Sequence, residues 1–108
     1  MNWNDFTAFI SEWDSYLRAR TKHGDREHKF ARMVKLSEEV GELASEVLAA
    51  EGDQRKSKLE DKKPEDLEDE FADVLITLFL LAKSYDIDML AATERKVEKI
   101  RAKGKDPV

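Results

Sequence analysis

The sequence has no cysteine, so it can form neither a disulfide framework nor a thiolate metal site. It also lacks a long apolar run. The longest apolar-rich stretch, FADVLITLFLLA, has 12 residues and contains an aspartate, which makes it too short and too polar to span a bilayer. The N-terminal segment MNWNDFTAFISEW is acidic and amphipathic, unlike a signal peptide. We therefore expect a cytoplasmic protein with no membrane partner.

Positive charge is in deficit, with 19 Lys and Arg against 24 Asp and Glu and a net charge of −5. A nucleic-acid partner held by a general basic surface is therefore not expected. The apolar content of 41% excludes a disordered chain, even though 40% of the residues are charged. A length of 108 residues fits one domain. Burial is limited at this size, so oligomerisation would add stability.

Apolar residues recur at helical spacing in four segments, and no segment has the alternation of a strand. The expected helices cover about residues 2–20, 27–51, 64–85 and 86–103. Gly52 is the expected C-cap of the second helix, and the polar segment 53–64 is expected to be a loop. The sequence therefore predicts an all-α four-helix bundle, with a single domain at 1–103 and a short tail at 104–108.

The second helix has an apolar stripe with carboxylates beside it. At about 100° per residue, the stripe predicted to form the core consists of Leu36, Val40, Leu43 and Val47. Glu39 and Glu42 project together from the edge of this stripe. Gly41 lies on the opposite side, and a glycine inside a helix costs about 1 kcal/mol against alanine. We therefore expect another backbone to approach closely at Gly41.

The third helix is apolar around its whole circumference from Phe71 to Leu81, as expected of a helix that is buried on every side. A single small domain seldom buries a helix so fully, so part of this surface is expected to contact another subunit. The predicted assembly is a homodimer or a dimer of dimers (a homotetramer).

Glu70 and Asp73 interrupt this apolar helix one turn apart. Two carboxylates from each of two facing helices would repel strongly, and a hard divalent cation with oxygen ligands relieves that repulsion. Mg²⁺ fits, with Mn²⁺ as a possible substitute, because neither cysteine nor a well-placed histidine is available. The alternative for the second helix is a solvated acidic face, but Asp73 lies too far into its helix to serve the N-terminus.

The segments Glu38-Glu39-Val40-Gly41-Glu42 and Glu70-Phe71-Ala72-Asp73 resemble the EExxE and ExxD motifs of the all-α nucleoside triphosphate pyrophosphohydrolases. The chain is most similar to the MazG-like branch, for which KLxEEVGEL followed by ExxDVL is typical. The resemblance covers about residues 30–103. It implies Mg²⁺-dependent hydrolysis of a (deoxy)nucleoside triphosphate between the α- and β-phosphates, which gives the nucleoside monophosphate and pyrophosphate.

The resemblance also implies roles for particular residues. Glu39, Glu42, Glu70 and Asp73 would hold the metal ion, and Glu38 would act as base for the attacking water. On the fourth helix, a basic pattern of the family points to Lys96 and Arg101 as phosphate-binding residues, although Ile100 stands where many relatives have asparagine. Lys35, beside the carboxylates, is a further candidate for binding the substrate.

Trp13, Tyr16, Phe30 and His28 are candidates for stacking on a base, but aromatic residues at helical spacing more often belong to a core. Two other functions stay open: a phosphoribosyl-ATP pyrophosphohydrolase, which shares the two acidic helices, and a non-enzymatic helical interaction module.

Overall fold

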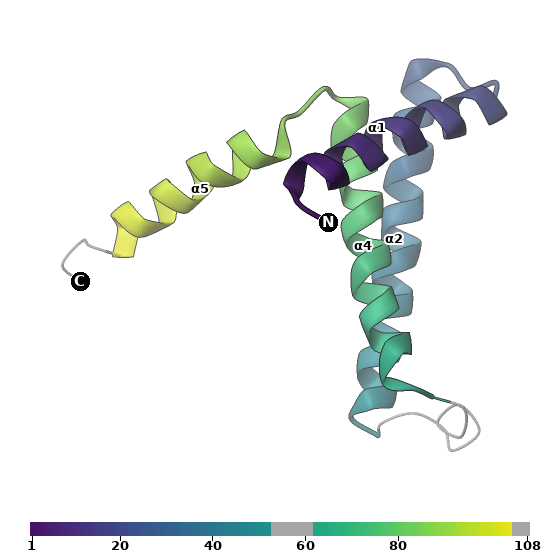
Figure 1. Cartoon of the computed structure of the whole chain (residues 1–108). Coiled ribbons are helices and arrows are strands. Elements are labelled where there is room, and N and C mark those ends of the chain that lie inside the picture. The colour runs from purple at the N-terminus through teal and green to yellow at the C-terminus, as the bar shows by residue number, and fades with distance from the viewer. Residues whose placement is uncertain (53–61, 105–108) are drawn as a thin grey trace.

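The computed structural model describes residues 1–52 and 62–104, and within these residues all regular secondary structure is helical. The helices are α1 (Trp3–Arg20), α2 (Asp25–Ala50), α4 (Pro64–Ser84) and α5 (Met89–Gly104), shown in Figure 1. The predicted all-α fold is confirmed, and each helix lies within a few residues of its predicted range. The loop expected at 53–64 falls mostly outside the described residues, as does the tail after Gly104.

The helix ends follow from local side-chain chemistry. The Asn2 side chain accepts a hydrogen bond from the Asp5 backbone N–H at 2.9 Å, and the Asp5 carboxylate accepts one from Asn2, which together form a capping box. Gly52 follows α2 with a φ of 78°, a left-handed conformation that favours glycine. Before α4, the Asp66 carboxylate accepts a hydrogen bond of 3.0 Å from the Lys63 backbone N–H.

Helices α2 and α4 lie side by side and antiparallel, and together they form a long hairpin (Figure 1). Helix α1 crosses this hairpin near the C-terminal end of α4 and packs mainly on α4. Helix α5 projects away from the other three helices, and it has no buried residue. None of the helices in the described residues combines the length and apolarity needed to cross a membrane.

The apolar core is small and lies where α1 crosses α4. It contains Ile10, Phe79 and Leu80. The ring of Phe79 makes edge-to-face contacts with Phe6 and Trp3, at centroid distances of 4.9 and 5.5 Å. Contacts of this kind fix the position of α1 on the hairpin.

Arg32, a buried residue of α2, adds a polar link among three helices. Its Nη1 donates hydrogen bonds to the Leu80 carbonyl oxygen at 2.7 Å and to Ser84 Oγ at 2.9 Å, both on α4. Its Nη2 lies 2.7 Å from Asp14 Oδ1 on α1. The guanidinium is suited to this role because it offers several donors in a fixed plane.

Three expectations about packing can be compared with the single chain. On α2, the predicted core stripe is only half-buried at Leu36 and Leu43, and Val40 is 48% exposed. On α4, Phe71 is 57% exposed, so the single chain leaves part of this apolar helix uncovered, and the expected contact with another subunit stays a prediction. Among the described residues, no atom of another element lies within 4 Å of a Cβ built on Gly41, so the expected close approach of a second backbone is not made within this part of the chain.

Candidate metal centre

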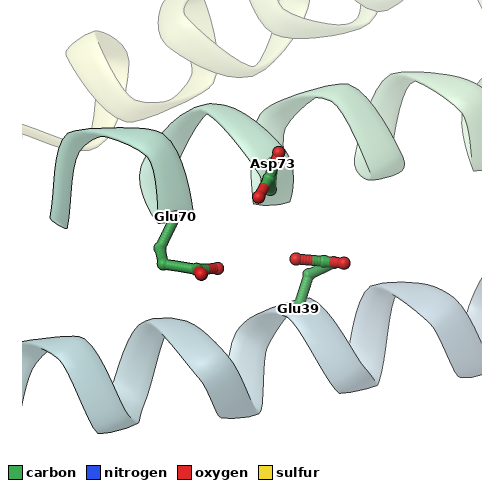
Figure 2. Close-up of side chains that lie close together, drawn as sticks. All are labelled: Glu39, Glu70 and Asp73. Carbon is green, nitrogen blue, oxygen red and sulfur yellow. The ribbon is translucent and has the colours of Figure 1, made fainter. Parts of the chain in front are cut away.

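Three of the four carboxylates predicted to bind a metal lie together between α2 and α4. Glu39 points from α2 toward α4, and Glu70 and Asp73 project from α4 into the same space (Figure 2). One oxygen from each residue lies within 4.8 Å of the others. The spacing of three residues places Glu70 and Asp73 on one face of α4, and the antiparallel packing brings Glu39 opposite them.

Two of these carboxylates are poorly compensated within the chain. Glu39 is only 7% exposed, and its Oε2 is buried without a hydrogen-bond partner. Glu70 Oε2 is likewise buried without a partner. A buried carboxylate oxygen without a partner costs free energy, because it has lost its water. Both residues belong to the group of three converging carboxylates.

The pKa shifts of two carboxyl groups also indicate a cation site. Burial raises the pKa of the Glu70 carboxyl above its usual value, and the negative charge of Glu42 raises it further. Burial, followed by the charges of Glu39 and Asp69, raises the pKa of the Asp73 carboxyl. The site therefore disfavours its own negative charge, and a cation between the carboxylates would reverse that effect.

The donor atoms fit a hard divalent cation. All three side chains offer carboxylate oxygens, which suit Mg²⁺ and Mn²⁺ rather than a soft metal. The unpartnered oxygens of Glu39 and Glu70 are free to serve as ligands. The residues present therefore fit the metal that the resemblance implies.

Glu42 and Glu38 lie beside this group, on exposed parts of α2. Glu42 is outside the three-carboxylate group, although its charge reaches Glu70. Lys35 Nζ lies 3.2 Å from Glu39 Oε1 and 3.7 Å from Glu38 Oε2. The hydrogen bond to Glu39 raises the pKa of the Lys35 ammonium, so the cation is held next to the carboxylates.

Lys96 and Arg101 are not brought to the carboxylates within one chain. Both lie on exposed parts of α5, and α5 projects away from the hairpin (Figure 1). They stay predictions as phosphate-binding residues.

Two of the aromatic residues considered for stacking on a base, Trp13 and Tyr16, form one group with Phe9, which the sequence analysis did not single out. Phe9, Trp13 and Tyr16 have their rings stacked along an exposed side of α1. The available signal was their spacing of four and three residues, which continues a helical stripe beside the core residue Ile10. Because this widens the apolar face of α1 beyond what α4 covers, Trp13 is exposed rather than part of the core.

The comparisons with known proteins agree with this geometry. The MazG nucleotide pyrophosphohydrolase domain model matches residues 28–107, a range that includes all three carboxylates but not α1. The uncharacterized protein YpjD of Bacillus subtilis (strain 168) is 42% identical over 76 residues, which cover 70% of this chain and 67% of that protein. No solved structure matches the chain. The chain belongs to the MazG nucleotide pyrophosphohydrolase family.

Proposed function

We propose that this protein hydrolyses a (deoxy)nucleoside triphosphate between its α- and β-phosphates, with Mg²⁺ as cofactor. The observation that carries the proposal is the meeting of Glu39, Glu70 and Asp73 between α2 and α4, with two buried oxygens that lack partners. Membership of the MazG family supports a nucleotide pyrophosphohydrolase in general. The choice of bond, metal and substrate goes beyond that family assignment.

Glu39, Glu42, Glu70 and Asp73 would hold the metal ion. When bound, Mg²⁺ supplies neutralisation of phosphate charge and a lower pKa for a coordinated water. Glu42 is exposed, which leaves its carboxylate able to turn toward the group. Mn²⁺ would substitute because it accepts the same oxygen ligands.

Glu38 would act as the base. Its carboxylate is exposed and is held by Lys35 beside Glu39, so it is accessible to a water molecule that approaches the bound phosphates. In the proposed reaction, water adds across the bond between the α- and β-phosphates, and its proton passes to Glu38. The products are the nucleoside monophosphate and pyrophosphate. Lys35 would bind the polyphosphate through its ammonium group.

Lys96 and Arg101 would bind phosphate in an assembled form of the protein. In one chain, α5 stands apart, so these residues would reach a polyphosphate only if α5 packs against a second copy or swings toward the hairpin. The exposed apolar side chains of Val40 and Phe71 support an assembly, either a homodimer or a homotetramer. A single domain at 1–103 and a cytoplasmic location also stay part of the proposal.

Product analysis by anion-exchange chromatography tests the reaction. The protein is incubated with common and modified (d)NTPs, with Mg²⁺ or with EDTA. We expect monophosphate and pyrophosphate only when Mg²⁺ is present. Diphosphate plus phosphate would mean that a different bond is cleaved and would contradict the proposal.

Glu70→Gln tests the site itself. We expect the rate to fall more than about 100-fold, because loss of even an outer partner of a metal ligand costs 10- to 100-fold. The matched control is Glu68→Gln, which removes an exposed carboxylate from the same helix outside the three-carboxylate group. If no nucleotide is turned over, phosphoribosyl-ATP is the next substrate to assay, and a non-enzymatic interaction module follows.

A further inference from the structure

The exposed rings of Phe9, Trp13 and Tyr16, here called the aromatic ladder, form a continuous stack on α1. Phe9 and Trp13 have ring centroids 6.1 Å apart with an interplanar angle of 14°, and Trp13 and Tyr16 have centroids 4.7 Å apart at 17°. Trp13 is 38% exposed, which is unusual for an indole that already has two ring neighbours. Apolar ring area of this size left in contact with water calls for a ligand or a partner.

Contacts on the other sides of α1 fix the direction in which the ladder points. Ile10 faces α4, where it packs with Phe79 and Leu80. Thr7 and Ser11 line a cavity together with Lys83, near the C-terminal end of α4. The ladder lies on the opposite side of α1 from Thr7 and Ser11 at 100° per residue. It therefore faces the middle of the hairpin, where Glu39 of α2 and Glu70 and Asp73 of α4 lie.

The aromatic ladder and the carboxylate group lie close together along the axis of the hairpin. Phe79, where α1 crosses α4, follows Asp73 by six residues, or about 9 Å of helix axis. On α2, Glu38 and Glu42 lie on the opposite side from the exposed Val40, and this is the side on which α1 crosses. The ladder and the open side of the carboxylate group therefore share one face of the hairpin.

We propose that the aromatic ladder binds the base of the nucleotide substrate by stacking. This inference rests on the proposed function, because the carboxylate group would hold the polyphosphate of the same molecule. Base stacking on aromatic side chains contributes to nucleotide affinity for any base, since every base has a π-face. The ladder lies outside residues 28–107, so the family match does not assign it a role.

The base would stack on the face of Trp13 that points toward Phe9, with the Phe9 ring turned aside to admit it. Phe9 is the more loosely stacked neighbour, with ring centroids 6.1 Å apart against 4.7 Å on the Tyr16 side. The outer face of Tyr16 is already covered by Arg20, whose guanidinium carbon lies 5.3 Å from the ring centroid. Arg20 also donates a hydrogen bond to the Tyr16 hydroxyl.

The chemistry of the ladder also indicates which class of substrate it would favour. The ladder would contact the base through ring faces, and the Tyr16 hydroxyl already accepts a hydrogen bond from Arg20. Few hydrogen bonds from the ladder to the edge of the base are therefore expected. The site is therefore expected to favour nucleotides over inorganic polyphosphate and to discriminate little among bases. Purines would bind somewhat more tightly, because they offer the larger ring area.

Tryptophan fluorescence tests the inference directly. The chain has two tryptophans, and Trp3→Phe leaves Trp13 as the sole emitter while keeping an aromatic ring against Phe79. This variant is titrated, in Mg²⁺, with a non-hydrolysable α,β-methylene deoxynucleoside triphosphate and separately with inorganic tripolyphosphate. We expect saturable quenching by the nucleotide and none by tripolyphosphate. Equal responses to both ligands, or none to either, would overturn the inference.

Affinity provides the second test. Trp13→Leu is expected to weaken binding of the same analogue, and to raise KM for each nucleotide, about 10-fold, in the range known for loss of one stacking contact. The matched control is Phe30→Leu. Phe30 is another exposed ring with an arginine over it, and it lies on the side of α2 away from α4 and the carboxylates, so it no longer counts as a candidate for stacking on the base. An unchanged nucleotide affinity in Trp13→Leu would overturn the inference. If the sedimentation coefficient changed as well, the ladder would belong to an interface between subunits.

Mn²⁺ binding, followed by electron paramagnetic resonance, separates this inference from the proposed function. Trp13→Leu should bind Mn²⁺ as the unaltered protein does, because the ladder contributes no ligand atom to the carboxylate group. Loss of Mn²⁺ binding in Trp13→Leu would mean that this variant disrupts the fold. Trp13→Phe, which keeps a ring for stacking, would then be the test: retained nucleotide affinity would support the stacking inference, and lost affinity with intact Mn²⁺ binding would overturn it. If the protein binds nucleotide at Trp13 but hydrolyses none, the stacking inference stands and the proposed reaction fails.

Discussion

At the scale of single residues, the buried carboxylates between α2 and α4 destabilise the metal-free fold. Glu39 is almost fully buried, and Lys35 compensates only one of its oxygens. Burial and neighbouring charge also raise the pKa values of Glu70 and Asp73. A folded-state pKa above the unfolded value means that the folded state binds protons more readily. The contribution of this proton binding to the free energy of unfolding is fully present below the pKa of the unfolded state, and it is lost as pH rises through the pKa of the folded state.

This sign leads to a prediction for the metal-free protein. Its free energy of unfolding should fall as pH rises above the ordinary glutamate value of 4.5, and Glu70→Gln should reduce the fall. In EDTA at neutral pH, Glu70→Gln is therefore expected to melt above the unaltered protein. Mg²⁺ at 100 times its Kd should reverse the order, since such binding stabilises the unaltered protein by about 2.7 kcal/mol.

Thermal melts in EDTA and in Mg²⁺, at several pH values, provide the measurement. Glu68→Gln serves as the control, because its carboxylate lies outside the three-carboxylate group. A metal-free Glu70→Gln that melts below the unaltered protein would show that Glu70 makes a stabilising contact in the absence of metal.

Arg32 gives a second prediction at this scale. Arg32→Met would leave the buried Asp14 with Arg18 alone, and the Leu80 carbonyl and Ser84 hydroxyl would lose their donor. Breaking a buried pair in this way costs about 3–5 kcal/mol. Urea denaturation is the measurement, with Lys29→Met as the control because its ion pair with Asp25 is exposed. A loss no larger than that of the control would mean that water replaces the guanidinium.

At the scale of helices, most of the fold is predictable from local chemistry. The proline and acids in the first turn of α4, the Asn2 cap and Gly52 all act within one turn, so their effects can be read from neighbouring residues. The pair Glu70 and Asp73 is predictable for the same reason, because two acids interrupt an apolar helix. Glu39 is harder to place, since the sequence puts it at the edge of an apolar stripe rather than in the α2–α4 contact.

The reason is that α2 has two sides able to pack. Val40 and Val47 look like a core by hydrophobicity, yet α4 of the same chain packs on the side that carries Glu39 and Arg32. Periodicity identifies an apolar stripe but not the partner that covers it. The sequence also contains no local signal for Arg32, whose partners lie 48 and 52 residues along the chain.

At the scale of the whole molecule, the exposed apolar residues give a prediction about assembly. Val40, Val47, Phe71 and Leu75 are exposed on the side of the hairpin away from α1. Phe71→Glu should therefore shift the protein to a smaller species in sedimentation velocity, because it places a charge in the expected interface. Phe30→Leu is the control. An unaltered protein that sediments as a fully active monomer would contradict the proposed assembly.

Helix α5 has a thermodynamic consequence of its own. Its first residue, Met89, packs against the core, but none of its 16 residues is buried, so tertiary packing adds little stability to its later turns. Helices of about 12–15 residues are marginal by themselves in water. In an isolated chain, α5 would therefore exchange with coil, and its peptide bonds would be open to proteolysis. Docking against a second copy would couple helix formation to association, so that dilution alone would unwind this end of the molecule.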